Sequence, residues 1–456
     1  MYPFFSYSIK RHYFQHSWYN FELLRLLGSA PYEGCEAAEF LETVTRIRPN
    51  SAKSWEEEFL KLAEATEALA RDAESHGLAT TARSAYLRAS NYYRCAQYLY
   101  PAARSEEQTR LLKLYDRSAS SFEAATTFFD HPVHRVSIPY SLPGNGGAEI
   151  TLPGRLYLPS KTNKLPGRKS PIVVCIGGAD STLEELYFVH AADGPRSGYA
   201  VLTYDGPGQG IPLRRDKLVL RPDYEVVAPI ILDWIEAYAR DHPEADLDVD
   251  AIALVGQSMG AFLALRAAVD PRVKAVVAID PFYDMWDMAM SRMRPWMIAM
   301  WEKQFIIRDS FMNWAGRRHG RVDIATRYSW GLGSGMFGID NGAEMLRNMK
   351  KYSFKPGLGE NEDLLANVRC PVLISAAAAD KNTLSPLADT QAIHRGLRNL
   401  NDDDKELWIA KTFAEGGGQA KVGAWSLLQY RTYKFLDKKL AIRPVPPIEN
   451  TGGHKK

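Results

Sequence analysis

Cysteine is scarce in this sequence, and the few cysteines present are scattered. The 456 residues include four cysteines with no CxxC spacing, namely Cys35, Cys95, Cys175 and Cys370. Two of them lie in strongly apolar stretches, which favours buried free thiols over disulfides or a metal site. We therefore expect neither a metal nor another cofactor.

The sequence also has little net charge and no long apolar run. The formal net charge is only +2, which gives no electrostatic footprint for nucleic acid or an anionic membrane. No apolar run approaches the ~20 residues of a membrane helix. Lys10, Arg11 and His12 interrupt the aromatic N-terminal stretch, unlike the apolar core of a signal peptide. We expect a cytoplasmic protein that binds neither nucleic acid nor membrane.

The length of the chain favours one catalytic domain with added helical parts. Two amphipathic segments, 54–77 and 78–100, predict a pair of antiparallel helices, with Ser54 as the N-cap of the first. The predicted parts are a helical arm (1–130), a core in two pieces (131–281 and 367–440), a helical cap between them (282–366) and a polar tail (441–456).

The pattern of strands predicts the fold class. Two alternating, β-rich runs flank the sequence Pro-Gly-Asn-Gly-Gly at 143–147 and predict an antiparallel hairpin. Further apolar strands then alternate with amphipathic helices, the pattern of a mostly parallel sheet covered on both faces. We expect an α/β protein with a sheet of eight strands.

The cap segment is rich in Met and Trp. One interpretation is that these residues pack the cap against the body of the protein. The alternative is that Trp286, Met290 and Trp296 line an apolar substrate pocket, since Met and aromatic side chains suit irregular hydrophobic ligands.

The strongest catalytic signal is Gly256-Gln257-Ser258-Met259-Gly260, which matches the G-x-S-x-G nucleophile elbow. An apolar strand runs directly into it and a helix continues from it, which is the required context. The turn exposes the serine oxygen at a helix N-terminus, whose dipole favours developing negative charge. The alternative is a serine in an ordinary strand–helix turn.

An elbow serine needs an oxyanion hole. One predicted donor is the backbone N–H of Met259. The second is expected in the loop Ile176–Ser181, where two glycines allow close approach of a ligand; the Ala179 N–H is the first candidate and Gly178 the next. Asp180 of the same loop is expected at the substrate pocket. The alternative is a tight Gly-Gly turn without a ligand.

A second glycine-rich loop follows the next strand. The loop Asp205–Gly210 matches neither G-x-G-x-x-G nor the P-loop, and we expect it to be a rigid loop beside the active site.

The acid of a triad is expected after the seventh strand, where Asp380 lies. Asp389, in the following helix, is expected to be solvated. Asp284 and Asp287, after the sixth strand, are secondary candidates for substrate contacts, with helix capping as the alternative.

The histidine of a triad is absent from its expected place. The loop between the last strand and the last helix, 414–423, contains no histidine. His394 and His454 are not placed to reach Ser258. His319 is expected to be exposed among arginines, and His190 to be a packing residue.

Together these motifs resemble a known family. IGGADSTLEEL, YDGPGQG, the GQSMG elbow and RASNYYRCAQYLYP are similar to the α/β-hydrolases encoded in fungal polyketide and polyketide–peptide clusters, such as the melanin-pathway polyketide-shortening hydrolase and those of fusarin- and cytochalasin-type clusters. The bacterial dihydroxypseudooxynicotine hydrolase, which cleaves a carbon–carbon bond, is a relative. The similarity covers roughly residues 15 to 440.

The resemblance implies an α/β-hydrolase fold with Ser258 as nucleophile, Asp380 as acid and an oxyanion hole from 177–179, closed over by the arm and the cap. The last loop of family members reads like G-A-x-x-H-C-x-x-G, and Gln419 lies at the histidine position. An amide accepts no proton at neutral pH, so Gln419 cannot act as a general base.

Three hypotheses follow. The first is a tailoring enzyme of secondary metabolism that acts on a polyketide-derived carbonyl compound, by C–C bond cleavage or aldol/Knoevenagel-type cyclisation. The second is a serine hydrolase with an unrecognised base, and the third is a ligand-binding protein without activity. The expected partner is a small apolar substrate, and a homodimer is left open.

Overall fold

The computed structural model describes residues 17–100, 105–141, 150–291, 293–356, 363–379 and 387–443. Eight strands form one sheet in the order β1-β2-β4-β3-β5-β6-β7-β8. The strands are β1 (Val133–Tyr140), β2 (Ile150–Tyr157), β3 (Ser170–Ile176), β4 (Ala200–Tyr204), β5 (Leu247–Gln257), β6 (Val273–Ile279), β7 (Val372–Ala377) and β8 (Lys405–Ala410).

The predicted hairpin and the predicted mostly parallel sheet are both confirmed. β1 pairs with β2 and β2 with β4 in antiparallel register, and β3 to β8 pair in parallel. The carboxyl ends of the parallel strands therefore meet at one edge, which is where open α/β sheets bind ligands.

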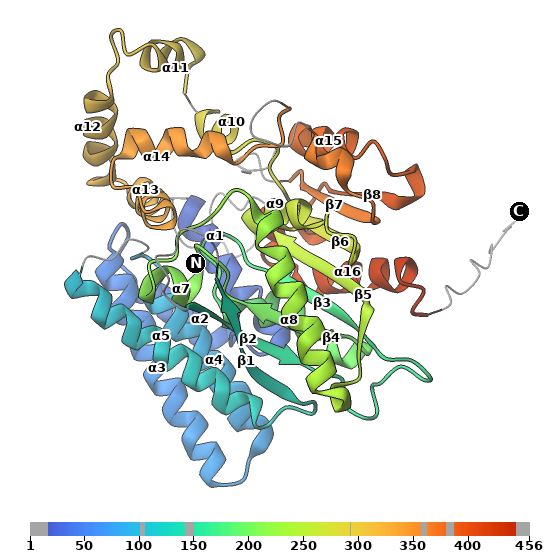
Figure 1. Ribbon diagram of the computed structural model, residues 1–456. Helices are drawn as coiled ribbons and strands as arrows, with labels where there is room; N and C mark the ends of the chain where they lie inside the picture. Colours follow the sequence, from blue (N-terminus) through green and yellow to red (C-terminus); the bar gives the residue numbers. More distant parts are fainter. Residues whose placement is uncertain are drawn as a thin grey trace, which may run out of the picture.

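Helices cover both faces of the sheet (Figure 1). On one face, alternate side chains of β3 such as Val174 pack with α8 (Ala228–Asp241) and α9 (Met259–Ala267). On the other face, Val173 and Cys175 pack with a π-helical turn, η3 (Tyr187–Ala191), and with α16 (Trp425–Lys439). This two-residue alternation explains why the central strands are apolar throughout.

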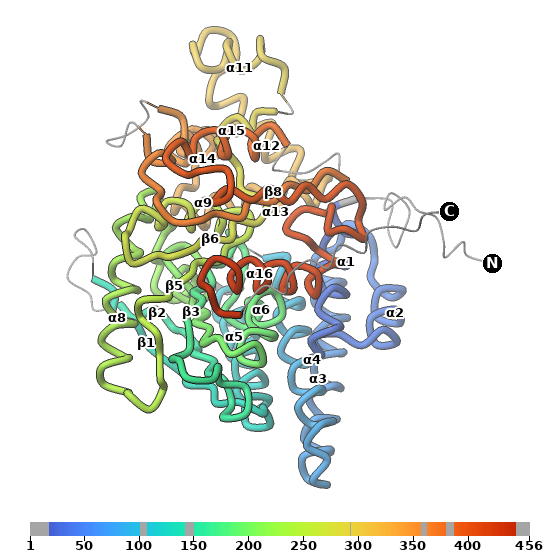
Figure 2. The backbone as a smooth tube through the Cα atoms, turned by 90° about the vertical axis from the view of Figure 1, so that its right-hand side faces the viewer, coloured from blue at the N-terminus to red at the C-terminus, as the bar shows by residue number. Residues whose placement is uncertain are grey.

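The N-terminal arm lies beside the sheet and below the cap, as Figures 1 and 2 show from two sides. Its helices are α1 (Ser17–Leu27), α2 (Ala37–Arg46), α3 (Ala52–Ser75), α4 (Ala79–Gln97) and α5 (Ser105–Thr126). The prediction of Ser54 as an N-cap was wrong. α3 begins one turn earlier, and the Ser51 side chain accepts the Ser54 N–H at 3.1 Å.

The cap follows β6 and consists of α10 (Met285–Met290), α11 (Pro295–Glu302), α12 (Asp309–Gly320), α13 (Ile324–Phe337) and α14 (Gly342–Asn348). Ile324 and Tyr328 of α13 pack into the apolar core of the arm. The cap and the arm are therefore joined to each other as well as to the sheet.

Two further structural findings concern the cysteines and the length of the helices. All four cysteines are buried free thiols, as the sequence predicted. Every helix of the described residues is too short or too polar to span a bilayer.

Candidate active site

The site is built around Ser258, which lies in a strained turn between β5 and α9. Its backbone has φ 51° and ψ −116°, and its N–H donates to the Ile279 carbonyl at 2.8 Å. A Cβ on Gly256 would lie 2.2 Å from the Gly260 carbonyl oxygen, and one on Gly260 would lie 2.1 Å from that of Ile176. These positions require glycine, so Ser258 lies in a closely packed strand–turn–helix with the backbone geometry expected of a nucleophile elbow.

The predicted oxyanion donors lie against this elbow. The Gly178 N–H donates to the Ser181 hydroxyl at 3.0 Å, so that donor is already engaged. Neither the Ala179 N–H nor the Met259 N–H donates to any other residue in the described part of the chain. The geometry therefore favours Ala179 and Met259 over Gly178 as a donor pair for a developing oxyanion.

Gln209 holds the oxyanion loop from behind. Its Nε2 donates to the carbonyls of Gly177 and Gly178, and its Oε1 accepts the Gly206 N–H at 3.0 Å. The loop Asp205–Gly210 thus fixes the orientation of the loop Ile176–Ser181. Next to it, burial raises the pKa of Asp205 to about 8, while its Oδ2 accepts the Ile211 N–H at the start of α7 (Gly210–Arg215).

Asp180 joins the oxyanion loop to the arm and to the cap. Its Oδ2 accepts from Arg25 Nη1 at 2.9 Å, from the Tyr98 hydroxyl at 2.6 Å and from the Tyr328 hydroxyl at 2.9 Å. Burial raises the pKa of Asp180, but Arg25 and the two hydroxyls outweigh it and lower the pKa to about 2. Helices α1, α4 and α13 therefore converge on the residue next to Ala179.

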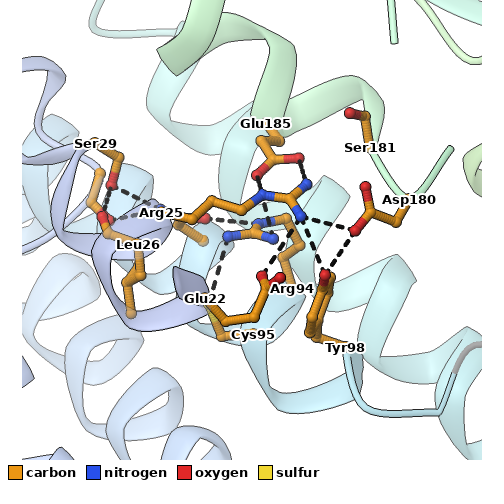
Figure 3. Close-up of polar contacts among 12 residues, drawn as sticks. Glu22, Arg25, Leu26, Ser29, Arg94, Cys95, Tyr98, Asp180, Ser181 and Glu185 are labelled. Carbon is orange, nitrogen blue, oxygen red and sulfur yellow. Dashed lines mark hydrogen bonds and ion pairs between the residues drawn. The ribbon is translucent and has the colours of Figure 1, made fainter. Parts of the chain in front are cut away.

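A buried charge cluster continues behind Asp180 (Figure 3). Arg25 forms a bidentate pair with Glu185, with distances of 2.6 and 2.5 Å, and Arg94 lies 3.3 Å from the same carboxylate. Glu22 lies 3.5 Å from Arg25, but burial outweighs this cation and raises the pKa of Glu22 to about 7. The cluster ties the arm to the site through charges that water does not screen.

On the other side of the elbow, the structure reveals a buried ion pair that the sequence analysis missed. Lys421 Nζ lies 2.7 Å from Asp280 Oδ1, and both side chains are fully buried. The Ser375 hydroxyl donates to the same oxygen at 2.8 Å, and the Lys421 ammonium lies 4.8 Å from the centre of the Trp408 ring. Burial lowers the pKa of Lys421 despite its partner.

Gln419 lies in the same short turn, η11 (Gln419–Lys421), and is buried. Its Nε2 approaches the Asp280 carbonyl at 3.5 Å, one residue from the Ile279 carbonyl that accepts the Ser258 N–H. Ala420 and Lys421 both adopt left-handed φ values of 55° and 57°, which turn the chain so that Lys421 points inward. The predicted acid, Asp380, lies outside the described residues.

The cap residues proposed as substrate contacts have structural partners. Asp284 caps α10 by accepting the Asp287 N–H at 2.7 Å, and it also accepts from the Ser353 hydroxyl. Trp286 stacks on Trp301 with ring centres 5.7 Å apart. Met290 is buried in the same cluster, whereas Trp296 is 58% exposed. The positions of Asp284, Trp286 and Met290 favour the capping and packing interpretations, and Trp296 takes part in neither.

The remaining titratable candidates lie apart from the elbow. His190 is buried without a partner for either ring nitrogen in the described part of the chain, and burial lowers its pKa to about 3. His319 is exposed. Asp389 is not simply solvated as expected, because its Oδ2 accepts the Tyr283 N–H at 3.0 Å and burial raises its pKa.

The sheet order, with a sharp Gly-x-Ser-x-Gly turn after β5 and a Gly-Gly loop after β3 at one edge, is that of an α/β-hydrolase fold. The chain belongs to the alpha/beta hydrolase family, whose sequence profile matches residues 173–417. The family predicted from the motifs is therefore confirmed.

Several relatives match over almost their whole length. The chain is 52% identical to the alpha/beta hydrolase ucsC of an Acremonium species, over 100% of this chain and 94% of the relative. It is 40% identical to the hydrolase pyiE of Pyricularia grisea, over 94% of this chain and 96% of the relative. Among solved structures, the 2,6-dihydroxy-pseudo-oxynicotine hydrolase superposes with a TM-score of 0.65 at 21% identity, over 92% and 97% of the two chains, and shares the fold. The family and these names mark a hydrolase-like enzyme.

Proposed function

We propose that this protein is a tailoring enzyme of secondary metabolism that acts on a polyketide-derived carbonyl substrate. Its reaction is C–C bond cleavage or an aldol/Knoevenagel-type ring closure, with Ser258 and the oxyanion donors as the reactive centre. The proposal rests on one observation. Two N–H groups without acceptors flank Ser258, whereas the loop where a base belongs offers Gln419 and an ion-paired lysine.

The chemistry follows from what such a site stabilises. A hydroxide ion from solvent takes the acidic proton from a carbon between two carbonyls and becomes water, and the negative charge then lies on the enolate oxygen, where the Ala179 and Met259 N–H groups would bind it. In ring closure, the enolate carbon attacks a second carbonyl of the same molecule, the resulting alkoxide takes a proton from water and regenerates hydroxide, and the ring then loses one water. Neither step needs an acyl-enzyme or an imidazole. Gln419 orients groups through its amide without transferring protons.

A second candidate is a conventional serine hydrolase with an unrecognised base. The strained elbow favours it, because φ 51° at Ser258 is the backbone geometry of an exposed nucleophile. In this case Ser258 forms an acyl-enzyme that water then cleaves.

The test uses a synthetic β-dicarbonyl compound with a second ketone placed for ring closure, analysed by mass spectrometry. Ring closure by the wild-type protein gives a product lighter by one water, and cleavage gives two fragments that together contain one added water. In the first case, Ser258→Ala should retain activity reduced by ~10–100-fold, because the backbone donors remain. Fragments together with a loss of several orders of magnitude in Ser258→Ala favour serine attack and contradict ring closure.

A further inference from the structure

A large cleft lies between the arm, the core and the cap. It has a volume of about 1120 Å³. Its walls come from α5, from α7 with the residues that follow it, and from α12 and α13. The cationic residues on these walls are Arg214, Lys217, Arg317, Arg321 and Arg327.

The charge of this cleft is one-sided. Five cationic residues line it, and Asp340 is the one carboxylate among the lining residues that the structure describes. Within the described part of the chain, Lys217, Arg317, Arg321 and Arg327 form no ion pair. Arg347, which lies outside the cleft, has by contrast a carboxylate partner in Asp309 at 2.6 Å. A concentration of unpaired cations attracts an anion.

The cleft also has an apolar wall. Leu112, Leu213, Val219 and Trp330 line it together with the cations. The Trp330 ring packs directly on the backbone of Gly316 and Gly342, since a Cβ on Gly316 would lie 2.0 Å from the ring and one on Gly342 would lie 1.9 Å from it. A fixed aromatic ring and aliphatic side chains next to guanidinium groups suit a ligand with both an apolar body and a charged end.

Two walls of the cleft are anchored to the oxyanion loop. α7 begins directly after Gln209, which binds the Gly177 and Gly178 carbonyls, and its six residues span ~9 Å. On α13, Tyr328 binds Asp180, while the adjacent Arg327 lines the cleft. A ligand in the cleft therefore lies beside the elements that position the oxyanion donors.

We propose that this cleft is a binding site for an amphipathic small molecule with an anionic group, which is a carboxylate or a phosphate. The arginines of α12 and α13 bind the charged end, and Trp330 with the neighbouring aliphatic side chains contacts the apolar body. Ser258 is not among the residues that line this cleft. Binding of a ligand in the cleft does not depend on the reaction proposed above.

The test measures binding directly by isothermal titration calorimetry on the full chain, with octanoate, octyl phosphate and octanol as probes. At least one anion should bind clearly tighter than octanol, and its affinity should fall as salt rises from about 50 to about 500 mM. The tighter of the two anions identifies the charged group. Equal binding of octanol, or no binding of either anion, overturns the proposal.

A matched pair of variants on one helix tests the location. Arg317 lines the cleft, whereas the next residue, Arg318, is exposed and does not. Arg317→Glu and Arg321→Glu should each weaken anion binding by about tenfold or more, and Arg318→Glu by less than about twofold. Both cleft residues are exposed, so the fold should survive, which thermal melting checks. Equal losses in Arg317→Glu and Arg318→Glu, or no loss in either, would place binding elsewhere and overturn the assignment.

Discussion

The two sides of Ser258 are built from different kinds of interaction. On the side of the predicted oxyanion donors, side chains hold the loop 177–180: Gln209 binds the carbonyls of Gly177 and Gly178, and Arg25 binds Asp180. On the opposite side, where a triad places its base, the described side chains turn inward and bind one another, with Lys421 on Asp280. In the proposed function, the first side presents donors to a ligand, whereas the second is held together by its own ion pair.

This difference separates two functions that a serine hydrolase combines. Stabilising a negative oxygen needs fixed dipoles, and the oxyanion side retains them. Transfer of a proton needs a group with a pKa near the working pH, and Gln419 has none. A site that binds an oxyanion but supplies no base suits a substrate acidic enough to form its enolate with solvent hydroxide, such as a 1,3-dicarbonyl compound, better than a reaction that needs an activated serine.

The largest effect is expected on breaking the inward-facing pair. Lys421→Met leaves Asp280 buried without its cation, and loss of one partner of a buried pair costs about 3–5 kcal/mol. The free energy of unfolding, measured in urea, should fall by that amount. Lys411→Met, at an exposed lysine in the loop after β8, should change it by less than about 0.5 kcal/mol.

A second variant tests whether the attraction between Lys421 and Asp280 is the source of this stability. Lys421→Met combined with Asp280→Asn removes both charges, and it should recover part of the stability lost in the single variant. If the double variant loses more free energy of unfolding than the two single variants lose in sum, the attraction between Lys421 and Asp280 is not the source of this stability.

The next effect concerns the charge cluster behind the oxyanion side. The pKa of Glu22 is about 7, against an ordinary value of 4.5, so the folded state binds this proton more tightly than the unfolded state. The stability that Glu22 contributes is therefore fully present below pH 4.5 and is lost as the pH rises through about 7. The loss is at most ~3 kcal/mol, from 1.36 kcal/mol per pKa unit.

Glu22→Gln removes this titration. Unfolding in urea between pH 4.5 and 8 should show the wild type losing stability relative to Glu22→Gln, with no further change above about pH 8. Glu107→Gln, at an exposed residue of α5, should follow the wild type. Parallel pH profiles for the wild type and Glu22→Gln would mean that Glu22 stays ionised in the fold.

The same contrast explains what the sequence could predict. The strands, the elbow and the oxyanion loop follow from local patterns, because period, glycine and turn chemistry act over a few residues. Lys421 and Asp280 lie 141 residues apart, and Arg25 lies 155 residues from Asp180. Such pairs form only when distant segments of the chain pack together, and no local sequence pattern predicts which residues will pair. The one hint was Lys421 itself, a lone cation in the glycine-rich loop 414–423.

The smallest effect is expected at Gln419, and it tests the difference between the two sides of Ser258 most directly. Gln419 is buried, and its amide approaches the Asp280 carbonyl beside the elbow. If it occupies the space of an imidazole, Gln419→His supplies the missing base, and the initial rate on a small activated ester should rise by roughly tenfold. The rate should increase with pH through about 6.5, since only the neutral ring accepts a proton. The ring-closing activity should stay level or fall.

Two variants determine whether such a gain comes from a rebuilt relay. Gln419→Leu removes the amide without adding a base, so it should give no gain. Adding Ser258→Ala to Gln419→His should abolish the gain, because the relay acts through the serine hydroxyl. An equal gain in Gln419→Leu would show that removal of the amide opens the site. A gain that survives Ser258→Ala would mean that the new histidine takes a proton from a water molecule rather than from the Ser258 hydroxyl. In either case Gln419 would not mark the position of a lost histidine, and the claim that this side of the site has lost proton transfer would have to be withdrawn.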